Sequence, residues 1–118
     1  MRLRLAQSRD LRPIQALLRD LAKAGEGDLD GEGELEAERL VRLEAERLVR
    51  FDPRRRVVVC AGALLDGAER LVGICALDVD ADAPEMVWAD DALDESLRPL
   101  LIRAARSRVA AIADRAAA

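Results

Sequence analysis

Two apolar runs of similar length, residues 56–65 and 71–80, lie close together near the middle of the chain. Both are rich in Val, Leu and Ala, and a short polar segment containing Gly67 separates them. Apolar runs of this length, bounded by turn residues, are typical of buried strands. The sequence therefore predicts an antiparallel hairpin at the centre of a sheet, and the rest of the chain has to cover both faces of that hairpin.

The segments around the hairpin have the periodicities of further strands and helices. The expected elements are strands at 1–6 and 85–89, a helix capped by Asp10, an acidic loop at 25–33, and helices at 34–51 and 97–115. A chain of 118 residues has room for one modest core. We therefore expect a single α+β domain over residues 1–118, in the order β-α-α-β-β-β-α, with helices packed on a mainly antiparallel sheet.

An eight-residue phrase, LEAERLVR, occurs at 35–42 and again without change at 43–50. Eight residues turn a helix roughly 80° past two full turns. The two copies therefore cannot present the same face to one core. We expect one copy to pack and the other to extend outward or to meet a partner.

Composition narrows the classes of function. Phe51 and Trp88 are the only aromatic residues, so the core is poor in large side chains. A net charge of −4 argues against general nucleic-acid binding. The absence of His removes the commonest metal ligand and the commonest general base, and no metal site is expected. No apolar run is long enough for a membrane span, and the first residues do not have the pattern of a signal peptide.

These features predict a cytoplasmic protein in which Cys60 and Cys75 are reduced core thiols. If the hairpin turn is centred on Gly67 and Ala68, the two cysteines lie opposite each other across the hairpin, and a disulfide there would be strained.

Two local phrases carry a resemblance to a known family. Residues 3–18 contain an R-x-A-x-x-x-D phrase that leads into I-x-x-L-L, and residues 71–77 contain V-G followed by small apolar residues. Together with the element order, they resemble the N-terminal half of the GCN5-related N-acetyltransferase superfamily. The resemblance implies a truncated acetyltransferase-like domain that lacks the C-terminal strands of the family.

In that superfamily, a glycine-containing loop between the fourth strand and the third helix holds the diphosphate of acetyl-CoA through backbone N–H groups. Aligning this chain places Leu93 at the Arg/Gln position of the loop, and Ser96 and Arg98 at its glycine positions. If a coenzyme binds, the resemblance assigns its diphosphate to Ser96, Leu97 and Arg98.

Carboxylates surround the same place, namely Asp90, Asp91, Asp94 and Glu95. Acidic side chains stabilise a helix N-terminus, but the same charge repels a phosphate. We therefore expect a degenerate coenzyme loop and no cofactor, and a domain that acts through association with a protein partner or as a homodimer through an open sheet edge. The alternative is an acetyl-CoA-dependent N-acetyltransferase with an atypical loop. The resemblance then makes Glu85 the catalytic base, although the Tyr that often serves as general acid is absent.

Two further clusters remain open to interpretation. Asp78, Asp80 and Asp82 alternate as in the start of a calcium loop, but Ala83 stands where the glycine belongs, which favours a solvated strand end. The arginines at 50 and 54–56 either hold an anion or pair with the Glu-rich helix, and the second interpretation is the simpler one.

Overall fold

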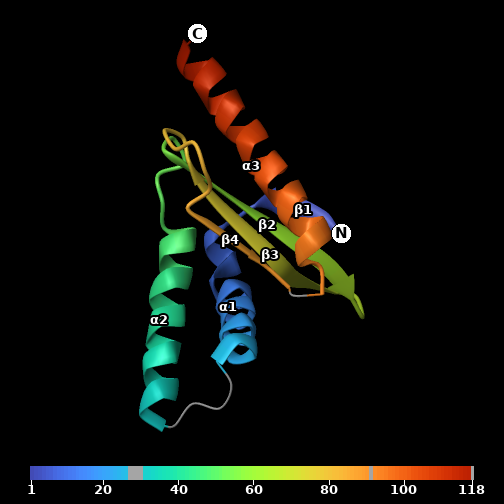
Figure 1. Cartoon of the computed structure of the whole chain (residues 1–118). Coiled ribbons are helices and arrows are strands. Elements are labelled where there is room, and N and C mark those ends of the chain that lie inside the picture. The colour runs from blue at the N-terminus through green and yellow to red at the C-terminus, as the bar shows by residue number, and fades with distance from the viewer. Residues whose placement is uncertain (27–30, 91, 118) are drawn as a thin grey trace.

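The computed structural model describes residues 1–26, 31–90 and 92–117, and over these residues it contains a four-stranded antiparallel sheet with three α-helices (Figure 1). The elements in chain order are β1 (Arg2–Leu5), the 3₁₀ helix η1 (Ser8–Asp10), α1 (Leu11–Glu26), α2 (Gly31–Val49), β2 (Arg56–Leu65), β3 (Ala68–Asp78), β4 (Met86–Ala89) and α3 (Asp94–Ala117). The predicted element order and the α+β class are therefore confirmed.

Several boundaries differ from the predicted ones for local physical reasons. The helix α3 begins at Asp94 rather than at 97, because Asp94 and Glu95 suit the first turn of a helix. In the segment expected to be a loop, 25–33, α1 continues to Glu26 and α2 already begins at Gly31. Residues 27–30 lie outside the described residues.

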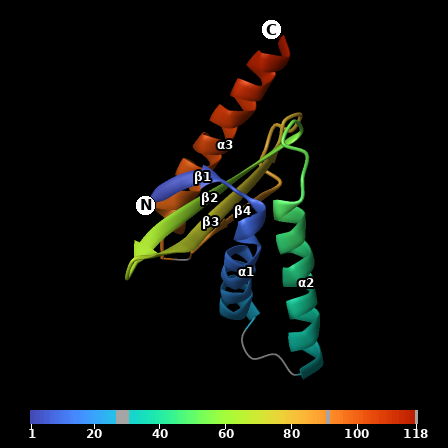
Figure 2. The ribbon, with the colours of Figure 1, turned by 180° about the vertical axis from the view of Figure 1, so that it is seen from behind.

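The sheet has the order β1-β2-β3-β4, with antiparallel pairing throughout. The helices α1 and α2 cover one face and α3 crosses the other, as Figures 1 and 2 show from opposite sides. On the first face, Ile14 and Leu48 pack against Ile74. On the second, Leu97 and Leu101 pack over Gly73, where an added Cβ would come within 2.8 Å of both leucine side chains. The V-G phrase of β3 thus serves the close approach of α3.

The central hairpin is tighter than predicted. Asp66 and Gly67 alone form its turn, with φ values of 52° and 82°, as two-residue hairpin turns require. Strand β3 therefore begins at Ala68, directly after the turn. Further along the hairpin, a bulge shifts the register between Ala61 and Gly62.

This register corrects the prediction that the two cysteines face each other. Cys60 pairs with Ile74, and Cys75 pairs with Val59. Because a one-residue offset moves a side chain to the other face, Cys60 lies under α1 and α2 whereas Cys75 lies under α3. Burial raises the pKa of the Cys60 thiol to about 12 and that of Cys75 to about 11. Both cysteines are free and buried, as predicted.

The two copies of the octapeptide have different surroundings within α2. Leu48 of the second copy is 1% exposed in the core, whereas Leu40, its equivalent in the first copy, is 57% exposed. The expectation that the copies present different faces is therefore confirmed, because an eight-residue step does not match the helical period.

Candidate functional site

The junction between β4 and α3 is held by its own hydrogen bonds. The Asp90 N–H donates to the Val72 carbonyl of β3, 2.7 Å away, which ends the β4 pairing. The Asp90 carboxylate then accepts from the Ala92 N–H at 3.0 Å, and the Asp90 carbonyl accepts from the Leu93 N–H at 2.8 Å. Asp90 thus organises the turn that aims α3 across the sheet.

The first turn of α3 uses the groups that the resemblance assigns to a coenzyme. The Ser96 and Leu97 N–H groups both donate to the Leu93 carbonyl, at 3.2 and 2.7 Å. The Ser96 hydroxyl donates to the same carbonyl at 3.2 Å. The side chain of Leu97 is buried against the sheet. Two of the N–H groups that would have to grip a diphosphate are therefore already engaged inside the turn.

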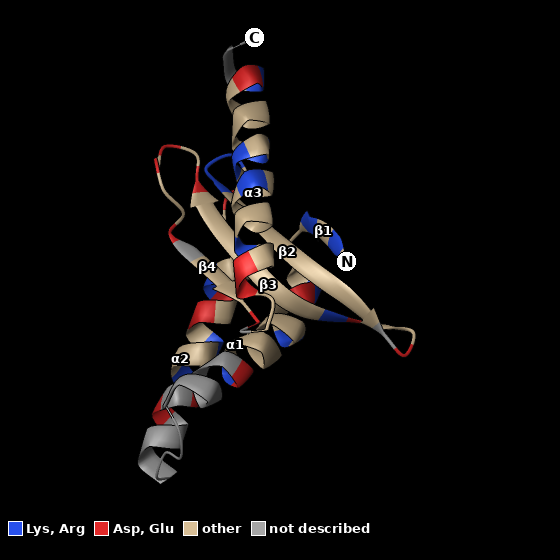
Figure 3. Cartoon of the chain, turned by 45° about the vertical axis from the view of Figure 1, so that its right-hand side comes forward, with Lys and Arg blue, Asp and Glu red and all other residues tan. Residues whose placement is uncertain are grey.

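The charge at this helix start is acidic (Figure 3). Asp94 and Glu95 occupy the first turn of α3. The cation nearest in sequence, Arg98, is bound to the Asp94 carboxylate through Nε and Nη2 at 3.0 and 2.8 Å. Asp91, the remaining carboxylate expected here, lies outside the described residues. The positive charge that could attract a phosphate is thus taken up by a carboxylate of the same helix.

Glu85, the expected catalytic base, lies just before β4, whereas Ser96 lies in the first turn of α3, which follows the other end of that strand. Its N–H donates to the Ala76 carbonyl at 3.0 Å. Its carboxylate forms ion pairs with Arg47 of α2 and Arg56 of β2. Both carboxylate oxygens are therefore engaged by guanidinium groups, Oε1 by Arg47 and Oε2 by Arg56. The structure therefore separates the two groups of predicted site residues and gives Glu85 a bridging role.

In the other two clusters, one residue of each takes part in an ion pair with the other, namely Arg56 with Asp78. Arg56 binds Asp78 at 2.7 Å in addition to Glu85, so its partners come from β3 and from the segment before β4 rather than from the glutamates of α2. Arg50 and Arg55 line an open hollow of about 540 Å³ that also contains Asp78 and other carboxylates. Over the described residues, no group of three or more Cys, Asp or Glu side chains is placed to hold a metal ion.

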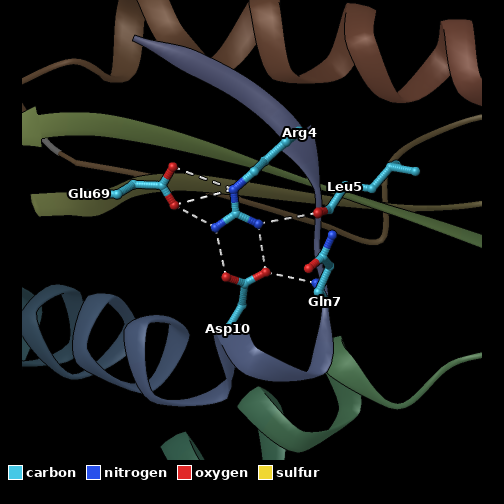
Figure 4. Close-up of polar contacts among 5 residues, drawn as sticks. All are labelled: Arg4, Leu5, Gln7, Asp10 and Glu69. Atoms are coloured by element: carbon cyan, nitrogen blue, oxygen red, sulfur yellow. Dashed lines mark hydrogen bonds and ion pairs between the residues drawn. The ribbon is translucent and has the colours of Figure 1, made fainter.

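The most tightly connected polar cluster of the described residues is one that the sequence analysis did not identify as a site (Figure 4). Arg4 of β1 binds the Asp10 carboxylate through both Nη atoms, at 2.7 Å each. The same guanidinium binds Glu69 of β3 through Nη2 at 2.5 Å and Nε at 3.2 Å. The Gln7 N–H donates to Asp10 at 2.7 Å. We call these three ionised residues, Arg4, Asp10 and Glu69, the Arg4 clamp.

The ionisation of the clamp follows from this geometry. Burial alone would raise the pKa of Asp10, which is 2% exposed, but hydrogen bonds from Arg4 and from the Gln7 N–H outweigh it and lower that pKa. The hydrogen bond from Arg4 lowers the pKa of Glu69. Hydrogen bonds with both carboxylates raise the pKa of Arg4 itself. All three groups are therefore charged at neutral pH, and the clamp ties β1 and the start of α1 to β3.

Two signals in the sequence pointed to the clamp. The R-x-A-x-x-x-D phrase contains both members of the buried pair, but the phrase alone does not show that the two side chains touch. Gly62 is the second signal, because an added Cβ would lie 2.7 Å from the Glu69 side chain. A glycine in a strand interior often marks such a close approach.

The outer edge of β4 is the second feature of interest. The Asp90 N–H bonds to β3, and alternate residues of an edge strand point their backbone groups outward. Val87 and Ala89 therefore direct theirs away from the sheet. Nη1 of Arg98 donates to the Val87 carbonyl at 3.4 Å, a long contact that covers one of these groups.

Among the helices of the described residues, none combines the length and the apolar character needed to cross a bilayer. No protein-family model, curated protein or solved structure matches the chain.

Proposed function

We propose that the chain is an acetyltransferase-like domain that does not bind a coenzyme at the β4–α3 junction and acts through protein association at the outer edge of β4. The order of its elements supports the acetyltransferase-like part. So does the Arg4–Asp10 pair, which gives a structural reason for the R-x-A-x-x-x-D phrase. The proposal has a negative part, about the coenzyme, and a positive part, about the edge.

The negative part depends on one observation: the Ser96 and Leu97 N–H groups are directed to the Leu93 carbonyl, in a helix turn that also carries Asp94 and Glu95. A phosphate there would meet Asp94 and Glu95. Two like charges ~4 Å apart at an effective dielectric constant near 20 repel by about 4 kcal/mol before salt screening. Arg98 and Asp94 neutralise each other, so Glu95 is the uncompensated charge of the first turn and Arg98 has no charge left over to attract a phosphate.

The positive part depends on the backbone of β4. A strand with outward N–H and C=O groups is a template for a further strand, and proteins usually cover or pair such an edge. An extended segment that pairs with β4 would gain main-chain hydrogen bonds at Val87 and Ala89. It would replace the long Arg98 contact with a regular one.

The charge around this edge selects the partner. If two copies of β4 paired antiparallel about Val87 and Trp88, Glu85 of each copy would lie opposite Asp90 of the other. Like charges directly opposite destabilise a strand pair. A strand of another protein with Lys or Arg beside its pairing residues would instead meet Asp90, Asp94 and Glu95 favourably. We therefore favour a heterologous basic strand over the homodimer.

Calorimetric titration with acetyl-CoA tests the negative part. We expect no binding at millimolar coenzyme, and micromolar binding would overturn it in favour of an N-acetyltransferase. The double variant Glu95→Gly with Ser96→Gly should then acquire measurable affinity, because it removes one charge and opens the backbone. For the enzyme alternative, Glu85 would also have to leave Arg47 and Arg56 to act as a base.

A peptide titration tests the positive part. The probe is a synthetic peptide of alternating valine and lysine, with a valine–glutamate peptide as the charge control. Val87→Pro removes an N–H that β3 does not use, so the fold should persist while binding of the lysine peptide is lost. Val87→Ala keeps that N–H and should bind as the unmodified chain does. Equal binding to the Pro variant, or no binding to any form, would contradict the edge proposal.

A further inference from the structure

A second hollow is lined by residues of the C-terminal half of α3. This half of the helix runs beyond the end of the sheet (Figures 1 and 2). It has a volume of about 270 Å³. Its walls include Leu5 of β1, Phe51, Val57 of β2 and Ile112 of α3. Arg108 and Arg115 of α3 line the same hollow. We call this hollow the α3 groove.

The charge of the α3 groove is opposite to that of the whole chain. Although the chain has a net charge of −4, no Asp or Glu of the described residues lines the groove. Arg108 and Arg115 are seven residues apart, two helical turns, and therefore lie on one face of α3. Over the described residues, no ion pair involves either of them. Arg56, which also contributes to the lining, is held by Asp78 and Glu85.

We infer that the α3 groove binds a medium-chain fatty carboxylate, with its alkyl chain along the apolar walls and its head group at Arg108 and Arg115. The apolar walls of the groove match the alkyl chain of the ligand. The two guanidinium groups of the groove that form no ion pair over the described residues match a carboxylate, which arginine binds in a bidentate manner. The small volume favours a small molecule over a helix of another protein, because a stable protein contact buries about 800 Å² on each partner.

Titration with decanoate below its micellar concentration tests the inference. Calorimetry and amide chemical shifts measure the binding. We expect a dissociation constant below about 1 mM. Affinity should rise about fourfold for each methylene added from hexanoate to decanoate, because each is buried in turn. Decanol, which has no charge, should bind at least about tenfold more weakly.

Two double variants distinguish specific binding of decanoate in the α3 groove from nonspecific attraction to the arginines of α3. Arg108→Gln with Arg115→Gln should weaken decanoate binding about tenfold or more. The matched control, Arg103→Gln with Arg106→Gln, removes two exposed arginines of the same helix that do not line the groove and should leave binding unchanged. Thermal unfolding of each variant checks that the fold is intact. The inference is overturned if decanol binds as well as decanoate, if both double variants lose affinity equally, or if decanoate does not bind.

Discussion

Over the described residues, two strands are followed by helices, and an acidic residue at each of these junctions is paired with an arginine. The two ion pairs differ in burial and in what they connect. At the β1–α1 junction, the Asp10 carboxylate is buried and bound to Arg4, which comes from the preceding strand. At the β4–α3 junction, Asp94 is partly exposed and bound to Arg98, four residues further along the same helix. The first pair joins two elements, whereas the second lies within one.

This difference indicates what each junction contributes. A buried ion pair that links elements is sensitive to the loss of either partner, because the other charge is left in the interior. An exposed pair within one helix adds only a few tenths of a kcal/mol. The β1–α1 junction therefore supports the fold, and the β4–α3 junction can change its charge at little cost to stability. Function can accordingly be altered at the second junction without unfolding the domain.

The largest expected effect comes from Arg4→Met. The substitution keeps the length of the side chain but leaves Asp10 buried without its cation. We expect the free energy of unfolding to fall by about 3–5 kcal/mol, measured by urea denaturation. A loss below about 1 kcal/mol would mean that the two junctions do not differ as the comparison requires.

The same clamp predicts how stability depends on pH. Folding lowers the pKa of both Asp10 and Glu69, so their contribution is present above their unfolded pKa values and is lost as the pH falls through the folded values. Stability should therefore decline as the pH is lowered below about 5, by up to about 1.4 kcal/mol per pH unit for each group. The Arg4→Met variant should show a shallower decline, and parallel curves for the two proteins would argue against the clamp.

A smaller effect is expected from Gly62→Ala, which would force the Glu69 side chain away from Arg4. Overpacking at this site should cost about 1–2 kcal/mol of unfolding free energy. A double-mutant cycle with Glu69→Ala isolates the cause, since Gly62→Ala should cost much less once that side chain is short. If the cost is the same in both backgrounds, the glycine serves the bulge between Ala61 and Gly62 rather than the clamp.

Periodicity predicted the order and the type of the elements, because each helix and strand has a buried face that repeats along the sequence. It could not predict the register of the central hairpin. The positions of Cys60 and Cys75 depend on a two-residue turn and a one-residue bulge, and each of these shifts the pairing without changing the apolar pattern. Leu40 and Leu48 show the same limit, since identical octapeptides leave one leucine exposed and bury the other.

The candidate site, too, was predictable from the sequence only where its features are local. The acidic character of the β4–α3 junction is local, so the sequence predicted it directly. The ion pairs of Glu85 with Arg47 and Arg56 join residues from three segments, and no pattern within one segment encodes them. The Arg4 clamp is intermediate, because Arg4 and Asp10 are six residues apart but Glu69 comes from a distant strand.

The smallest expected effect comes from Arg98→Met, the counterpart of Arg4→Met at the second junction. It removes an exposed pair within α3, so the free energy of unfolding should fall by about 0.3–0.5 kcal/mol. The same substitution releases the Val87 carbonyl at the edge of β4. Binding of the valine–lysine peptide should therefore become tighter, which the same titration measures. A loss as large as that of Arg4→Met would show that the β4–α3 junction also supports the fold, and the contrast between the two junctions would fail.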